Sequence, residues 1–203
     1  MFTQIGAKRE SDFSEPLGML GDCHKRIRFF LNDLARLAES AEEPLDGTRR
    51  VALERALRYF RESGPRHTAD EEESLFPRLR AIKDTRLDET LEKVRELEAD
   101  HERANKAHDA VDVLGARWLA EGVLGGEEAA RLRALLQDLS ELYEHHLDVE
   151  DTQVFPMAAF LLTEEDQIAV GREMAMRRGI AGEIVGGGVR LAGVPREIRL
   201  ARE

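Results

Sequence analysis

Residues 67–77 read HTADEEESLFP, and residues 146–156 read HLDVEDTQVFP. Each stretch begins with a histidine, places a glutamate four residues later and closes with Phe-Pro. On an α-helix, residues four apart lie about one turn apart on the same face. The repeated pattern therefore predicts two long helices, each turning an imidazole and a carboxylate to one side.

Composition narrows the class of protein that carries this repeat. The chain has 203 residues and a formal net charge of −11, which disfavours a phosphate backbone as a partner. A single cysteine, Cys23, excludes an internal disulfide, and no apolar run approaches the ~20 residues that cross a bilayer. The first residues also lack the apolar stretch of a signal peptide. We expect a soluble, cytoplasmic protein that binds neither nucleic acid nor membrane.

The spacing of apolar residues and of turn signals predicts four long helices. They are expected at about 16–40, 47–82, 86–122 and 127–161, and the second should bend at Gly64-Pro65 because proline removes a helical hydrogen bond. Short connections between long helices favour an all-α, antiparallel up-down four-helix bundle.

Four segments follow from this pattern. We expect an N-terminal extension over 1–14, the bundle over 15–162 and an extra helix over 163–178 that Thr163 caps with Asp166. The Gly-rich segment 179–203 is expected to be a flexible or docking tail. Its VRLAG and IRLA pieces offer the alternative of a short strand.

Histidines interrupt the apolar stripes of all four helices. The inward positions are Leu17, Leu20, His24, Ile27 and Leu31; Leu57, Phe60, His67 and Glu71; Leu91, Val94, His101, Asn105 and His108; and Leu139, Leu142, His146 and Glu150. One histidine on an apolar face is more often a hydrogen-bonded core residue than a ligand, and His-x-x-x-Glu arises by chance in an acidic chain.

The position of each histidine along the bundle separates candidate ligands from core residues better than the His-x-x-x-Glu spacing does. His67 and His101 lie equally far from the turn expected near residue 84, and His101 and His146 are almost equidistant from the turn near 124. At ~1.5 Å per residue these side chains share one layer, which His24 joins less closely and His108 misses by roughly 10 Å. Burying several imidazoles and two carboxylates without partners is costly, so a pair of metal ions is the natural counterpart. Mixed nitrogen and oxygen ligands favour iron, with manganese or zinc as alternatives.

These segments resemble the hemerythrin-like proteins, also called HHE cation-binding domains. The resemblance rests on His24, HTADEEESLFP, His101 in EADHERANKA, and HLDVEDTQVFP, and covers about residues 15–160. It implies an up-down four-helix bundle with two non-haem irons. The implied terminal ligands are His24, His67, His101 and His146, and the implied bridges are Glu71 and Glu150.

The sequence departs from oxygen-carrying hemerythrins at two positions. Asn105 stands where they have a second third-helix histidine, and the shared register favours Glu150 over Asp151 as the last ligand. A site of four histidines and two glutamates resembles that of the di-iron proteins associated with repair of iron centres and with nitric oxide chemistry. Those proteins usually carry an additional cysteine-bearing N-terminal segment, which this sequence does not show. We expect dioxygen, nitric oxide or peroxide to be bound, sensed or reduced, with a possible electron donor. Iron storage or donation, or a metal-stapled interaction module, are the alternatives.

Other side chains have simpler expected roles. Cys23 is read as a packing thiol, His145 as a surface residue, and Asp70, Glu72 and Glu73 as a solvated face. The apolar residues expected to limit water access to the metals are Leu20, Ile27, Phe60 and Leu142. Tyr143 and Asn105 are expected to make hydrogen bonds near the layer. His108 is expected to be solvated or to support the layer, and an additional ion held by His108 with Asp112 is the alternative.

Overall fold

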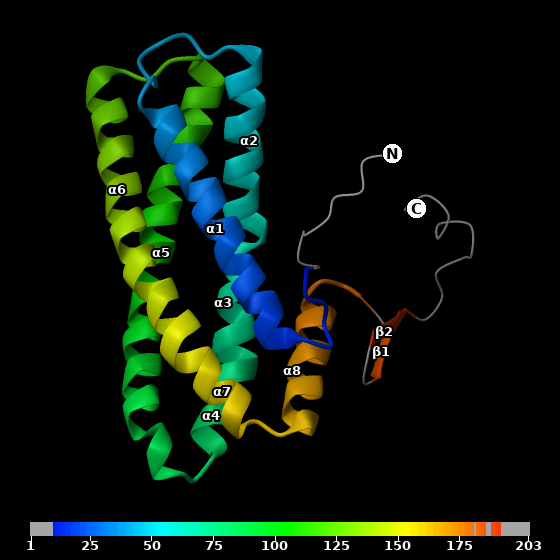
Figure 1. Ribbon diagram of the computed structural model, residues 1–203. Helices are drawn as coiled ribbons and strands as arrows, with labels where there is room; N and C mark the ends of the chain where they lie inside the picture. The colour runs from blue at the N-terminus through cyan, green and yellow to red at the C-terminus, as the bar shows by residue number, and fades with distance from the viewer. Residues whose placement is uncertain (1–9, 181, 186–187, 192–203) are drawn as a thin grey trace, which may run out of the picture.

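The computed structural model describes residues 10–180, 182–185 and 188–191. Four columns of helix run side by side in alternating directions (Figure 1). The first is α1 (Pro16–Ala38) and the third is α5 (Asp88–Glu121), which the short 3₁₀ turn η2 (Thr85–Leu87) precedes. The second column contains α2 (Gly47–Glu62), α3 (Gly64–Asp70), the π-helical turn η1 (Glu71–Leu75) and α4 (Phe76–Ala81). The fourth contains α6 (Gly126–Val149), the π-helical turn η3 (Glu150–Val154) and α7 (Phe155–Leu161). The predicted all-α four-helix bundle is confirmed.

Local signals explain where the helices begin and end. The side chain of Asp46 accepts a hydrogen bond from the backbone N–H of Arg49 at the start of α2. Gly122 ends α5 with φ of 78°, a left-handed conformation that glycine adopts without a steric penalty. The predicted bend at Gly64-Pro65 is a full break between α2 and α3, with Pro65 in the first turn of the new helix.

The two repeated stretches share one irregularity. In both, α-helix widens to a π-helical turn at the glutamate and returns to α-helix at the Phe-Pro pair. Pro77 and Pro156 have no N–H, so they fit the places where the backbone changes its hydrogen-bond register. Such single π turns are frequent at functional sites.

An additional helix, α8 (Glu164–Arg177), packs beside the lower part of the bundle, against α1, α3 and η1 (Figure 1). Thr163 and Asp166 form the expected capping box. Beyond it, β1 (Gly182–Val185) pairs with β2 (Gly188–Leu191) in an antiparallel hairpin, so the VRL piece is a strand whose edge partner comes from the same segment. The IRLA piece lies outside the described residues, and a docking role for the tail stays a prediction.

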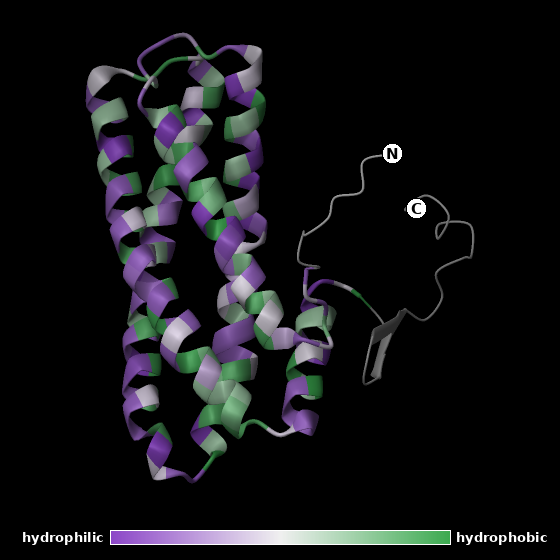
Figure 2. Cartoon of the chain, viewed as in Figure 1, coloured by the Kyte–Doolittle hydropathy of each residue, from purple (hydrophilic) through white to green (hydrophobic). Residues whose placement is uncertain are grey.

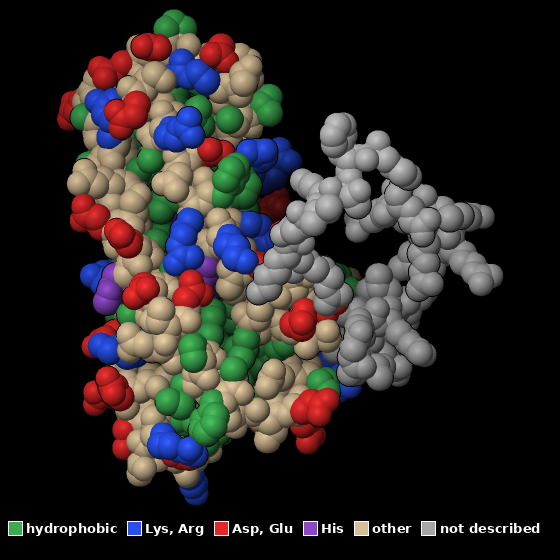
Figure 3. Space-filling model, in the orientation of Figure 1, with side chains coloured by type: hydrophobic (Ala, Val, Ile, Leu, Met, Phe, Trp, Pro, Cys, Tyr) green, Lys and Arg blue, Asp and Glu red, His purple; other side chains and the backbone are tan. Residues whose placement is uncertain are grey.

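Two apolar clusters fill the bundle. The first contains Leu31, Leu57, Trp118 and Leu136, and the second, which α8 also covers, contains Leu20, Phe76, Leu97 and Met174. Along every column, the buried histidines and glutamates lie between these clusters. Figure 2 shows polar residues on the outward faces, and Figure 3 shows acidic and basic side chains interspersed over the visible face. Among the described residues, no helix is long and apolar enough to cross a membrane.

Candidate metal centre

The structure brings together all six residues that the sequence predicts as ligands. His24 comes from α1, His101 from α5, His67 with Glu71 from the second column, and His146 with Glu150 from the fourth. All six are buried, and the two glutamates are 0% exposed. The approximate heights inferred from the sequence therefore correspond to one shared layer.

The six side chains form two groups with the spacing of metal ligands. Ligand atoms of His24, His67, Glu71 and Glu150 lie within 4.8 Å of one another, and so do those of His101, His146 and Glu150. Each group contains two imidazoles, and Glu150 belongs to both groups. Such sets of buried histidines and glutamates can bind metal ions.

Each glutamate faces both groups. Glu71 directs Oε1 to His67 Nε2 at 3.5 Å and Oε2 to His101 Nε2 at 3.4 Å. Glu150 Oε2 lies 3.2 Å from His24 Nε2 and 3.4 Å from His146 Nε2. Two atoms each ~2.1 Å from a common cation lie about 3.0–3.4 Å apart, so these separations fit ligands that share an ion. Both carboxylates therefore lie between the two groups of imidazoles.

Carboxylates hold the outer nitrogens of two imidazoles. Asp151 Oδ1 lies 2.8 Å from His24 Nδ1, and Glu72 Oε1 lies 2.8 Å from His101 Nδ1. Asp100 Oδ2 lies 3.5 Å from His146 Nδ1, which has no hydrogen-bond partner. Metal-binding histidines commonly donate their second ring N–H to a carboxylate, which fixes the ring and leaves the other nitrogen for the metal. Here the free nitrogen is Nε2, on the side of the two glutamates.

The prediction that Asp70, Glu72 and Glu73 form a solvated face holds for Glu73, which is exposed, and is wrong for the other two. Glu72 holds the outer nitrogen of His101, and Asp70 is fully buried. Consecutive residues of an α-helix point in different directions, but the wider π turn lets both Glu71 and Glu72 serve the centre. The same turn in the fourth column lets Glu150 and Asp151 do so. A signal was present in the sequence, because both repeats place a second acidic residue directly after the glutamate.

The phenylalanine of each repeated stretch also contacts a histidine of a helix outside that stretch. Phe155 stacks on His24 with ring centroids 5.2 Å apart, and Phe76 lies parallel to His101 at 6.5 Å. Each repeated stretch thus supplies a glutamate that faces both groups, a carboxylate that holds an imidazole, and an aromatic ring. The carboxylate and the ring serve the lone histidine of a helix outside the stretch. This near twofold relation explains why the chain contains the pattern twice.

The electrostatics of the layer favour positive charge. Burial opposes protonation of His24, but Asp151, Glu150 and Glu71 outweigh it and raise its pKa to about 11. Burial likewise opposes protonation of His101, yet Glu71 and Glu150 raise its pKa to about 9. Burial alone would raise the pKa of Glu71, and the surrounding imidazoles hold it well below its usual value instead. Without metal, protons therefore occupy part of this site.

Unpaired polar atoms concentrate in the same layer. In the described part of the chain, ten buried side-chain nitrogen and oxygen atoms have no hydrogen-bond partner, and nine of them belong to the six predicted ligands. Each such atom costs about 1–3 kcal/mol, so together they would rival the ~5–15 kcal/mol total stability of a typical protein. The atoms approach one another without hydrogen-bond geometry because they aim at common points. The residues present therefore fit bound cations.

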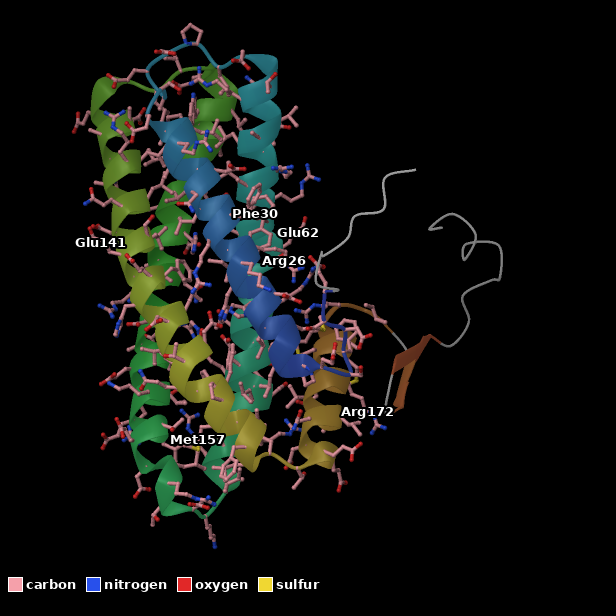
Figure 4. All side chains as sticks on the ribbon, in the orientation of Figure 1. Arg26, Phe30, Glu62, Glu141, Met157 and Arg172 are labelled. Carbon is pink, nitrogen blue, oxygen red and sulfur yellow. The ribbon has the colours of Figure 1, made fainter. Side chains whose placement is uncertain are left out.

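The other two histidines are separate from the six, whereas the Cys23 thiol interacts with His67. Cys23 is buried, and Arg26, which extends from α1 (Figure 4), donates a 3.3 Å hydrogen bond to its sulfur. His145 is exposed, as expected. His108 contacts the Tyr143 hydroxyl at 3.0 Å, while Asp112 pairs with Arg61, which gives no support to an ion held by His108 and Asp112.

A cluster of charges ties α8 to the turn that carries Glu71. Asp70 is 0% exposed, and its carboxylate receives Arg178 Nη2 at 2.6 Å and Arg177 Nη1 at 3.0 Å. Arg177 also donates to the Ser74 hydroxyl at 2.8 Å. Asp70 and Ser74 thus face α8 while Glu71 faces the histidines, so α8 supports the turn that carries Glu71.

A cavity of about 360 Å³ opens on the centre between the second column, α5 and α6. His67, His101 and His146 lie at its inner end, and its walls include Ile27 and Phe60, two of the residues expected to limit water access. The other two lie elsewhere: Leu20 is fully buried in the second apolar cluster, and Leu142 packs against the first. Asn105 lines this cavity but is exposed, and Tyr143 bonds to His108. Both groups of imidazoles can therefore be reached from one space.

Fold and site together define a class of protein, a four-helix bundle whose polar layer is built to hold cations. The chain belongs to the hemerythrin HHE cation-binding domain family, whose profile matches residues 15–158. It is also similar to an uncharacterized protein of Haemophilus influenzae, with 26% identity over 171 residues that span 83% of this chain and 92% of the relative. Helix α8 lies beyond the family match.

Proposed function

We propose that the layer binds two iron ions and uses them to bind, sense or reduce a small oxidant such as dioxygen, nitric oxide or peroxide. The observation that carries this proposal is the orientation of Glu71, which presents one carboxylate oxygen to His67 and the other to His101. Two imidazole groups joined by carboxylates suit a pair of ions better than one. Nitrogen and oxygen ligands in this ratio favour iron.

Each group of side chains has a part in this function. His24 and His67 would hold one ion and His101 and His146 the other, with Glu71 and Glu150 between them. Asp151 and Glu72 keep the outer nitrogen of two imidazoles hydrogen-bonded, which leaves Nε2 as the metal-facing atom. Bound iron would supply exchangeable coordination positions and electrons for a small oxidant.

The surroundings control what reaches the site. Leu20, Leu75 and Phe76 close the layer on the side of the second apolar cluster, and each is 0% exposed. The cavity leaves an approach on the opposite side, past Phe60 and Tyr143. We propose that the oxidant enters there and that an external electron donor restores the reduced state.

Metal analysis after anaerobic iron loading tests the proposal. We expect about two irons per chain and an oxo-to-iron absorption band in the near ultraviolet that responds to dioxygen or nitric oxide. Less than one iron per chain would overturn the di-iron proposal. Rapid transfer of iron to a mild chelator, without a spectral response to oxidants, would support iron donation instead.

A pair of variants tests the assignment of ligands. His101→Ala should remove most of the iron from one group, whereas His108→Ala removes a histidine that contacts Tyr143 and should leave iron content nearly unchanged. Equal losses of iron in the two variants would contradict the assignment.

A further inference from the structure

The cavity beside the centre is larger than a diatomic oxidant requires. A water molecule has about 30 Å³ of liquid volume, and small-molecule pockets begin near 300 Å³. The 360 Å³ found here therefore suits a molecule about the size of one ring. Two lining residues have little bulk, Gly64 at the start of α3 and Ala104 of α5.

The walls of the cavity favour a compact apolar body. Ile27, Leu34, Leu57, Phe60 and Val111 supply its apolar surface. Aromatic side chains add flat faces, since the Phe60 and His108 rings stack with centroids 4.4 Å apart. A hydrocarbon ring entering this space would exchange water for apolar and aromatic contacts.

The charges on the wall disfavour an anion. Arg61 is the one Lys or Arg side chain among the described residues that line the cavity, and its Nε is 2.5 Å from Asp112 Oδ1. Asp109 adds a second carboxylate to the same wall. On this wall, a carboxylate or phosphate ligand would meet two acidic groups and a guanidinium that is already paired. A neutral molecule therefore fits the part of the cavity away from the imidazoles better.

One hydrogen-bonding pair lies on the apolar wall. Tyr143 Oη lies 3.0 Å from His108 Nε2, and Tyr143 lies next to the inner end, with its ring centroid 6.1 Å from that of His146. Burial lowers the pKa of His108 to about 4 and raises that of Tyr143, so both groups are neutral near pH 7. When the phenol O–H donates to His108, the phenol oxygen can still accept a hydrogen bond from a ligand.

We propose that this cavity is a binding site for a small neutral organic molecule that has an apolar, ring-sized body and one hydroxyl group, which hydrogen-bonds to Tyr143. The ligand class is that of simple alcohols and phenols. This goes beyond the proposed function, because binding of such a molecule requires no reaction with an oxidant.

Calorimetric titration of the purified, metal-loaded protein with three probes tests the proposal. Benzyl alcohol has the ring and the hydroxyl, toluene has the same body without oxygen, and benzoate has a similar body with a negative charge. We expect benzyl alcohol to bind about fivefold more tightly than toluene, as one hydrogen bond predicts, and benzoate to bind least. Absence of binding by both neutral probes, or tightest binding by benzoate, would overturn the proposal.

Three variants locate the binding. Ala104→Leu adds bulk inside the cavity and should weaken both neutral probes at least tenfold, whereas Ala107→Leu makes the same change on α5 outside this cavity and should not. Tyr143→Phe should weaken benzyl alcohol about fivefold and leave toluene unchanged. Equal effects of the two alanine variants would place the binding elsewhere and overturn the proposal, as would unchanged benzyl alcohol binding in Tyr143→Phe.

Helical circular dichroism confirms that each variant is folded. Repeating the titration with metal-free protein separates binding in the cavity from binding of a probe oxygen to iron. If the protein takes up no iron but the probes follow the expected pattern, the proposed function fails and this site stands. If iron binds as proposed but the probe pattern is absent, this inference fails by itself.

Discussion

The contact between Asp70 and α8 gives a prediction whose size follows from the structure. Arg178→Gln removes the guanidinium that approaches the Asp70 carboxylate at 2.6 Å, while Arg177 remains at 3.0 Å. Breaking a buried ion pair costs about 3–5 kcal/mol when the remaining charge has no other partner. Because Arg177 stays, we expect a loss of about 2–3 kcal/mol in the free energy of unfolding. For a chain of this length, that lowers Tm by about 5–10 °C.

Urea denaturation of the metal-loaded protein measures this loss. Arg172 provides the matched control: it is an exposed arginine of α8 that projects away from the bundle (Figure 4), and Arg172→Gln should change stability by less than about 0.5 kcal/mol. Asp70→Asn removes the buried charge, so combining it with Arg178→Gln should cost less than the sum of the two single changes by about 1–2 kcal/mol. If Arg178→Gln behaves like Arg172→Gln, or if the double variant is additive, the account of α8 as a buried electrostatic support is wrong.

Three further predictions concern the centre and its cavity. Glu72→Gln should weaken metal binding about 10–100-fold because it loosens His101, whereas the exposed neighbour Glu73→Gln should change it less than twofold; equal effects in metal titrations would contradict the role of Glu72. In metal-free protein, the raised pKa values of His24 and His101 stabilise the fold fully below about pH 6.5, and this contribution is lost as pH rises through about 9 and 11. Urea midpoints should therefore fall with pH over that range without metal, and parallel curves with and without metal would refute this. Burial lowers the pKa of His108 to about 4, so its effect on stability has the opposite sign. The wild type should lose about 2–3 kcal/mol relative to His108→Phe as pH falls from about 6.5 to 4, and no difference between their acid unfolding curves would contradict this.

Periodicity in the sequence was sufficient to predict the bundle and to collect the six residues of the centre. Helical spacing places His67 with Glu71, and His146 with Glu150, on one face, and antiparallel packing with short turns brings equal heights together. Both properties depend on residues close in the sequence, because an α-helix has a fixed number of residues per turn and a short connection places consecutive helices side by side. The capping box at Thr163 is predictable for the same reason.

The orienting contacts could not be predicted by assuming regular α-helix. The π turns change the direction of Glu72 and Asp151, so two residues that regular helical geometry turns away from the layer hold His101 and His24. A π turn contains one more residue than a regular α-helical turn, and a prediction that assumes a constant helical period does not include this extra residue.

Hydrophobic periodicity is a one-dimensional signal, so the order of residues is enough to predict the class of fold, the height of the polar layer and the residues that face it. The packing of the helices sets which carboxylate holds which imidazole, how Arg177 and Arg178 reach Asp70, and where the cavity opens. Those relations join residues far apart in the chain. They depend on side-chain direction and on the room left between packed helices, which spacing along the sequence does not encode.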